Sequence, residues 1–148
     1  NKEEYGSIIS VDAFSPAGLE PHHTDLYWYG IHGVETLYAL MGTGCKQVTR
    51  IFNADGEVVV GLWGDGRIST FRGIRKGPHP YGARVVTDEG VYTSDPIDGS
   101  LYRALLVETV KFLKGGKPPV TIEEMREVFS FMTAAQKSSD QGGIPVSM

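Results

Sequence analysis

Apolar side chains recur at two different spacings along the chain, and these spacings separate helical from extended segments. A helix is predicted over about Tyr29–Met41, because apolar residues recur there three and four positions apart. Gly42 and Gly44 follow it, and glycine favours the left-handed conformation that commonly ends a helix. The predicted buried side consists of Ile31, Val34, Leu37, Tyr38 and Met41.

The middle of the chain is predicted to be a β-meander, since its short segments are rich in valine, isoleucine, threonine and aromatic residues. Short turns with Asp-Gly or glycine join these segments, which implies antiparallel pairing. Val58–Trp63 is apolar on both faces, so either helices cover one face and a partner the other, or the sheet is sandwiched within the protein. Strands are predicted at Gly6–Phe14, Gln47–Phe52, Val58–Trp63, Arg67–Arg75 and Ala83–Thr87, with short ones at Val91–Thr93 and Pro145–Met148, and a loop at Ser15–Asp25.

A helix is predicted over about Leu101–Lys114, with Asp98 or Ser100 as its cap and Gly115-Gly116 at its end. A second helix begins at the capping-box sequence Thr121-Ile-Glu-Glu124. It is predicted to end near Gly142-Gly143 and to bury Ile122, Met125, Val128, Phe129, Met132 and Ala135.

The order strand, helix, strands, helix, helix indicates an α+β protein with about three helices on one face of an open, mainly antiparallel sheet. Residues 1–148 are enough for a single domain. The net charge of −4 and the scattered basic residues argue against nucleic acid as a partner, and no apolar run is long enough to span a membrane. The single cysteine, Cys45, excludes an internal disulfide and is expected to be a small buried side chain.

One ionisable side chain, His32, lies in the first turn of the otherwise apolar first helix. The positive end of the helix dipole favours the neutral imidazole, which can accept a proton as a general base does. Glu35 and Thr36 are expected beside it, and Asp25 in the preceding loop can reach the same helix end. A histidine that is hydrogen-bonded for structural reasons is the alternative.

Other side chains could bind a small polar molecule. Tyr27, Trp28 and Tyr29 precede His32, and they either pack together or line a sugar or polyol site. Arg72 and Arg75 lie on a predicted strand, and each could hold a carboxylate or phosphate through two hydrogen bonds, although strand alternation puts them on opposite faces. A solvated surface or an intersubunit pair is the alternative.

A dinucleotide-binding loop is rejected, and a metal site is only a minor alternative. Gly42-Thr-Gly-Cys-Lys-Gln47 follows a helix and lacks the third glycine of a dinucleotide-binding loop. No metal site is predicted, because the spacing of the four candidate ligands matches no metal motif. These candidates are His22, His23, His32 and Glu35.

Four stretches, in the right order, resemble the C-terminal domain of the glucose–fructose oxidoreductase/inositol dehydrogenase (Gfo/Idh/MocA) enzymes. The resemblance covers nearly the whole chain, and the order of the motifs is a stronger signal than any one of them. The stretches are Asp25 through Gly42, the valine-rich meander, Leu101–Gly116 with Lys117-Pro118-Pro119-Val120, and Met132-Thr-Ala-Ala-Gln-Lys-Ser-Ser-Asp-Gln-Gly142.

The resemblance implies a two-domain oxidoreductase whose N-terminal Rossmann domain, absent from this chain, binds NAD or NADP. No cofactor is then expected in this chain itself. The C-terminal domain binds a sugar, cyclitol or related polyol, and its exposed sheet face forms homo-oligomers. The family's conserved histidine matches His32, which implies a catalytic role. Beside it, the residues expected to bind substrate are Asp25, Trp28, Tyr29 and Arg72.

The chain departs from the family at one informative position. The family usually has an aspartate four residues before the histidine, and Trp28 stands there instead. The family's catalytic lysine belongs to the Rossmann domain, so this chain alone is not expected to catalyse hydride transfer. A non-catalytic binding or assembly module that kept the fold is the competing hypothesis.

Overall fold

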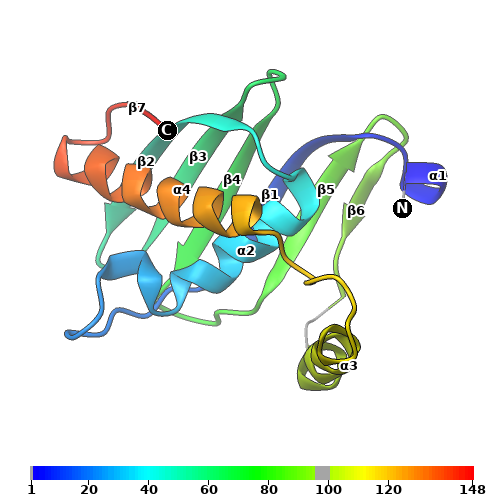
Figure 1. The fold of residues 1–148 in the computed structure, drawn as a ribbon. Coiled ribbons are helices and arrows are strands. Elements are labelled where there is room, and N and C mark those ends of the chain that lie inside the picture. Colours follow the sequence, from blue (N-terminus) through cyan, green and yellow to red (C-terminus); the bar gives the residue numbers. More distant parts are fainter. Residues whose placement is uncertain (1, 96–100) are drawn as a thin grey trace.

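The computed structural model describes residues 2–95 and 101–148, in which helices cover one face of a seven-stranded sheet (Figure 1). This is the open-faced, mainly antiparallel α+β fold that the sequence predicts. The strands are β1 (Ile8–Pro16), β2 (Cys45–Asn53), β3 (Gly56–Trp63), β4 (Ile68–Ile74), β5 (Gly82–Thr87), β6 (Val91–Thr93) and β7 (Val146–Ser147). The helices are α1 (Lys2–Tyr5), the 3-10 turn η1 (Asp25–Tyr27), α2 (Gly30–Met41), α3 (Leu101–Leu113) and α4 (Ile122–Asp140).

The strand order is β6-β5-β1-β4-β3-β2-β7, so the first strand lies inside the predicted meander. It pairs parallel with β4 and antiparallel with β5, and Ala13 is opposite both Phe71 and Ala83. The β4–β5 connection is therefore a longer crossing over residues 75–81 and not a tight hairpin. The meander prediction was wrong at this point, because the local turn signals carry no information about insertion of a distant strand.

The core lies between the sheet and two helices, α2 and α4. Gly33 lets α2 lie close to the sheet, because a Cβ at this position would be only 2.2 Å from Phe71 Cε2. Gly42 ends α2 with a positive φ of 71°, as predicted for a glycine cap, but its ψ of −177° differs from that of the left-handed helical conformation. Buried side chains from both layers complete this core, among them Val11, Val34, Leu37, Val59, Phe71, Phe131 and Met132.

The start of α4 agrees with the prediction, but part of its buried stripe does not. The Thr121 hydroxyl accepts a hydrogen bond from the Glu124 N–H at 3.1 Å, which confirms the cap. Three residues predicted to be buried are exposed, because the helix turns its Phe131 side to the sheet. They are Ile122, Met125 and Phe129.

Helix α3 lies apart from this core, on the helix side of the sheet, and none of its residues is buried (Figure 1). The predicted caps Asp98 and Ser100 lie outside the described residues. Among the described residues, no helix is long and apolar enough to cross a membrane.

Candidate functional site

His32 lies in the first turn of α2 and is accessible from outside the protein. Its side chain is 54% exposed, and its Nδ1 lies 3.2 Å from the Glu35 carboxylate, as the i,i+3 spacing predicts. The Thr36 hydroxyl donates a hydrogen bond to the His32 backbone carbonyl and not to the ring. The imidazole Nε2 has no hydrogen-bond partner within the described residues, so a bound molecule can reach this atom.

A hollow of about 420 Å³ lies beside His32, between the start of α2 and the β4–β5 connection. The rings of Tyr29 and Tyr81 lie 6.2 and 6.4 Å from the His32 ring, and both line the hollow. Burial, followed by the nearby Tyr29 and Tyr102 hydroxyls, raises the pKa of Tyr81, so its hydroxyl remains a hydrogen-bond donor at neutral pH. Arg75 and His79 also line this space. The hollow is thus lined by aromatic faces and polar groups, and His32 lies next to its two tyrosines.

Two other residues predicted to bind substrate, Trp28 and Arg72, lie in different parts of the molecule. Trp28 is half exposed and stacks on His23 with ring centroids 4.4 Å apart. Arg72 lies on the open face of the sheet, because its neighbours Phe71 and Gly73 point to the helix side. The structure therefore brings Tyr29 and His32 together and leaves Arg72 on the opposite face of the sheet.

Asp25 belongs to a buried ion network beneath the start of α2. Arg50, only 2% exposed, binds both Asp25 oxygens, with its Nη2 2.9 Å from Oδ1. The same guanidinium contacts the Glu57 carboxylate, which also binds Arg75 Nη2 at 2.5 Å. Burial raises the pKa of Glu57, and the two arginines offset only part of that effect. Burial by itself would lower the pKa of Arg50, but its hydrogen bonds and ion pairs with Asp25 and Glu57 outweigh burial and raise it.

The network fixes the backbone that leads into α2. Asp25 has φ of 41°, a left-handed conformation that is strained for a residue other than glycine. Its two bonds to Arg50 hold it there, and Tyr27 anchors the same turn through a 2.7 Å hydrogen bond to Thr133 on α4. Asp25 therefore supports the position of His32 from below, while its own carboxylate is occupied by Arg50.

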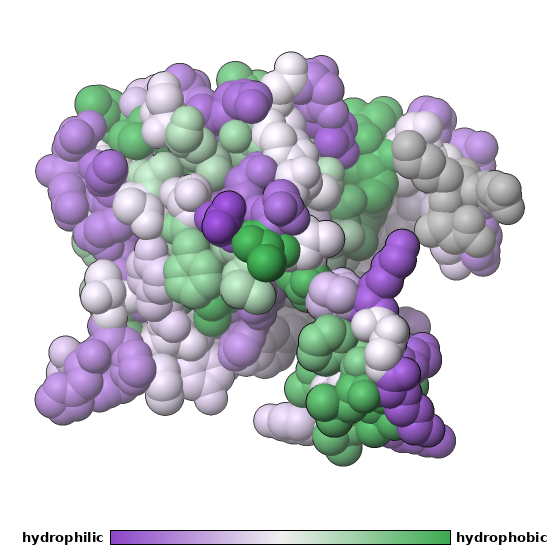
Figure 2. All heavy atoms as spheres, in the orientation of Figure 1, coloured by the Kyte–Doolittle hydropathy of each residue, from purple (hydrophilic) through white to green (hydrophobic). Residues whose placement is uncertain are grey.

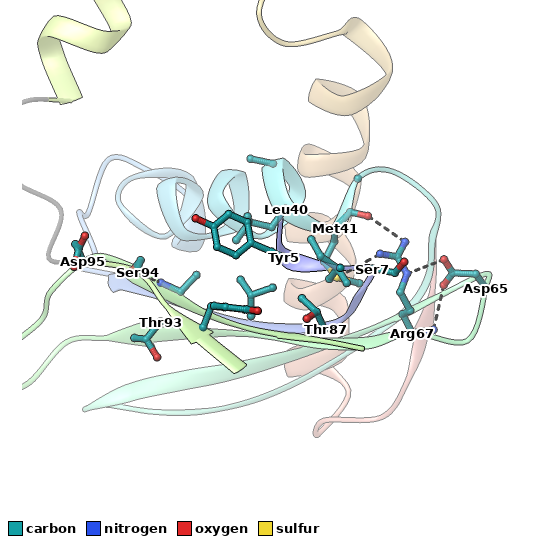
Figure 3. Close-up of a pocket in the computed structure, with 17 residues that line it drawn as sticks. Tyr5, Ser7, Leu40, Met41, Asp65, Arg67, Thr87, Thr93, Ser94 and Asp95 are labelled. Atoms are coloured by element: carbon teal, nitrogen blue, oxygen red, sulfur yellow. Dashed lines mark hydrogen bonds and ion pairs between the residues drawn. The ribbon is translucent and has the colours of Figure 1, made fainter. Parts of the chain in front are cut away.

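A larger hollow of about 990 Å³ lies at the other end of α2 (Figure 3). Arg67 crosses its rim, with Nε 2.7 Å from Asp65 and Nη2 donating to the Met41 carbonyl at 3.1 Å. This contact satisfies the C-terminal end of α2, where a cation is favourable. Nine residue steps along α2 separate His32 from Met41, which puts the two about 14 Å apart along the helix axis. The arginine therefore completes a helix end. The described lining of this hollow includes the ionisable side chains Tyr5, Asp65, Tyr92 and Asp95 but no histidine.

Among the described residues, no group of three or more histidine, cysteine, aspartate or glutamate side chains could hold a metal ion. Cys45 is buried, as predicted, and burial is the main reason that the pKa of its thiol rises to about 11.

Comparison with solved structures identifies dehydrogenases with the same fold. GenD2 from gentamicin A biosynthesis in complex with NAD aligns with a TM-score of 0.80 and 20% identity, over 100% of this chain and 57% of that one. Myo-inositol dehydrogenase from Lactobacillus casei, in complex with NAD(H) and myo-inositol, aligns with a TM-score of 0.70 and 12% identity, over 99% of this chain and 56% of that one. The WlbA dehydrogenase from Bordetella pertussis, in complex with NADH and UDP-GlcNAcA, aligns with a TM-score of 0.72 and 13% identity, over 99% of this chain and 58% of that one.

These neighbours are Gfo/Idh/MocA-type dehydrogenases, and the chain has the fold of part of such an enzyme, consistent with a C-terminal domain. The chain spans less than three-fifths of the length of each of these three solved structures. No protein-family model and no curated protein sequence matches it.

Proposed function

We propose that this chain is the substrate-binding and oligomerisation domain of an NAD(P)-dependent oxidoreductase that acts on a sugar, cyclitol or related polyol. The observation that carries the proposal is the exposed His32 beside a hollow lined by Tyr29 and Tyr81. The fold supports it, since structures with this fold include dehydrogenases bound to myo-inositol or to a nucleotide sugar.

In this proposal, the chain supplies the proton acceptor and the substrate contacts. A substrate hydroxyl in the hollow donates its proton to His32 Nε2, while Glu35 holds the other ring nitrogen and favours the imidazolium that forms. Tyr29 and Tyr81 offer aromatic faces to the C–H groups of the ring and hydroxyls to its oxygens. The carbon that bears this hydroxyl would lose a hydride, and a bound nicotinamide would supply the acceptor for it.

The chain's own glycines do not fit a dinucleotide. Gly42 and Gly44 follow the C-terminal end of α2, where helix carbonyls and not N–H groups are free. The proposal therefore places cofactor binding on a Rossmann domain outside this chain.

The test is His32→Asn in the full-length protein, with His22→Asn on the exposed loop as the matched control. We expect kcat to fall by roughly 10²- to 10⁴-fold, the usual contribution of a general base, while the free energy of unfolding changes little. The control should keep full activity. Activity unchanged per folded His32→Asn molecule would contradict the catalytic role.

One observation favours a second function, a non-catalytic binding or assembly module. Trp28 stands where the family has an aspartate, and the nearby Asp25 is bound to Arg50 and not free to assist His32. Full-length protein that binds cofactor but converts no member of a broad polyol and sugar panel would favour this alternative.

A further inference from the structure

Helix α3 carries a large apolar surface that nothing in the described residues covers. Leu105, Leu106 and Leu113 are 60%, 63% and 76% exposed, and no residue of this thirteen-residue helix is buried. In Figure 2, hydrophobic residues gather on α3, which lies apart from the rest of the molecule.

The apolar residues occupy one half of the α3 surface. At 100° per residue, a continuous half-turn of the helix is apolar apart from Thr109, whereas Arg103, Lys111 and Glu108 lie on the other half. An apolar surface of this width is rarely left in water by a folded protein, so a partner of matching character is expected. Its members are Leu101, Tyr102, Leu105, Leu106, Val110, Phe112 and Leu113.

The position of α3 restricts what that partner can be. The helix lies on the helix side of the sheet (Figure 1), so self-association through the open sheet face would leave it uncovered. The outward side of α4 adds three exposed apolar residues on the same side of the sheet. They are Ile122, Met125 and Phe129.

The candidate site and α3 lie on the same side of the sheet. Helix α2, whose first turn carries His32, covers the same face of the sheet beside which α3 lies (Figure 1). In the proposed reaction, the hydride acceptor must reach a substrate in the hollow beside His32. The domain that carries it must therefore approach from the side on which α3 lies.

We propose that the apolar half of α3, together with the outward side of α4, is the surface on which the dinucleotide-binding domain docks. The inference rests on the proposed function and assigns to α3 the role of an interdomain contact. Interfaces of this kind within a chain commonly bury several hundred Å² or more, which the exposed half of a helix can supply.

The test is hydrogen exchange of the α3 amides in the full-length protein, with NAD and NADP binding measured on the same samples. Leu105→Glu places a charge within the apolar half, and Val107→Glu places the same charge about 200° away on the other half. We expect protected α3 amides in the unmodified protein. Leu105→Glu should speed their exchange about tenfold or more, and Val107→Glu by less than about twofold.

Each other result overturns the proposal in a recognisable way. Unprotected α3 amides in a protein that binds NAD or NADP overturn the docking surface and leave the proposed function intact. Protection that rises with protein concentration identifies a second copy as the occupant. Equal effects of the two variants contradict a directional contact. A full-length protein without a dinucleotide-binding domain overturns both proposals.

Discussion

At the scale of single residues, the ion network shows what the sequence pattern could have revealed. Arg50 shares the inward side of β2 with Val48, and Glu57 shares the inward side of β3 with Val59. Charges of opposite sign at inward strand positions are the signal of a buried ion pair, because neither charge is stable there alone. Their partners Asp25 and Arg75 lie in connecting segments, and no local pattern indicates such long-range pairing.

Arg50→Met should lower the free energy of unfolding by about 3–5 kcal/mol, since the Asp25 and Glu57 carboxylates lose a buried partner. Urea denaturation measures the change, and Arg126→Met on the exposed side of α4 is the matched control, with an expected change within about 0.5 kcal/mol. Equal losses in the two variants would contradict the structural role of the network.

Cys45 predicts a pH dependence of stability. The pKa of its thiol is about 11 in the folded protein, against about 8.5 in an unfolded chain. Between these two pH values the thiol is protonated in the folded state and ionised in the unfolded state. The contribution of the buried thiol to stability is therefore fully present below pH 8.5 and is lost as pH rises toward 11.

The thiol should accordingly react slowly with a thiol reagent at pH 8 and rapidly after unfolding in guanidinium. Removing the group with Cys45→Ala should flatten the decline of unfolding free energy between pH 8.5 and 11. Rapid labelling of the folded protein at pH 8 would show that the thiol is not held in its protonated, buried form.

At the scale of elements, hydrophobic spacing predicts helices and strands well and contacts between them less well. The helix and strand bounds agree within a few residues, and the cap at Thr121 is as expected. The insertion of β1 and the orientation of α4 depend on distant packing. The same spacing of apolar residues in α4 permits either of two adjacent stripes, and the contact of α4 with β2 selects the side that carries Phe131.

The position of α2 tests this packing directly. Gly33→Ala should destabilise the protein by about 1–3 kcal/mol, because the new Cβ would lie 2.2 Å from the Phe71 ring and 2.6 Å from Ser15 Oγ. The cost of this steric clash exceeds the roughly 1 kcal/mol that alanine gains in helix propensity. Gly30→Ala in the same helix is the control, since its nearest neighbour is the end of the Leu26 side chain at 2.6 Å. Thermal unfolding compares the two, and a stabilised Gly33→Ala protein would show that α2 is free to move away from the sheet.

At the scale of the whole molecule, the two faces of the sheet have different roles. The helix face carries the core and the candidate site, and His32 was identified from sequence because a polar residue interrupts an apolar helix start. Arg72 was assigned to that site, yet strand alternation puts it on the other face. The hollow itself could not be predicted, because Tyr81 and His79 reach it through the crossing made necessary by the inserted β1.

The open face predicts self-association. Outward positions of adjacent strands place apolar side chains in a patch, where Leu62 is paired with Ile68 and Ile51 with Val58. Such a patch favours a twofold contact between copies. Sedimentation should therefore give a concentration-dependent dimer or larger species, and Ile68→Glu should shift it to monomer. Leu19→Glu is the control, because Leu19 and Ile68 have similar exposed fractions, 59% and 55%. Leu19 lies in the loop before η1 and not on the open face of the sheet. A clean monomer at high micromolar concentration, or the same shift in both variants, would mean that this face does not hold the copies together.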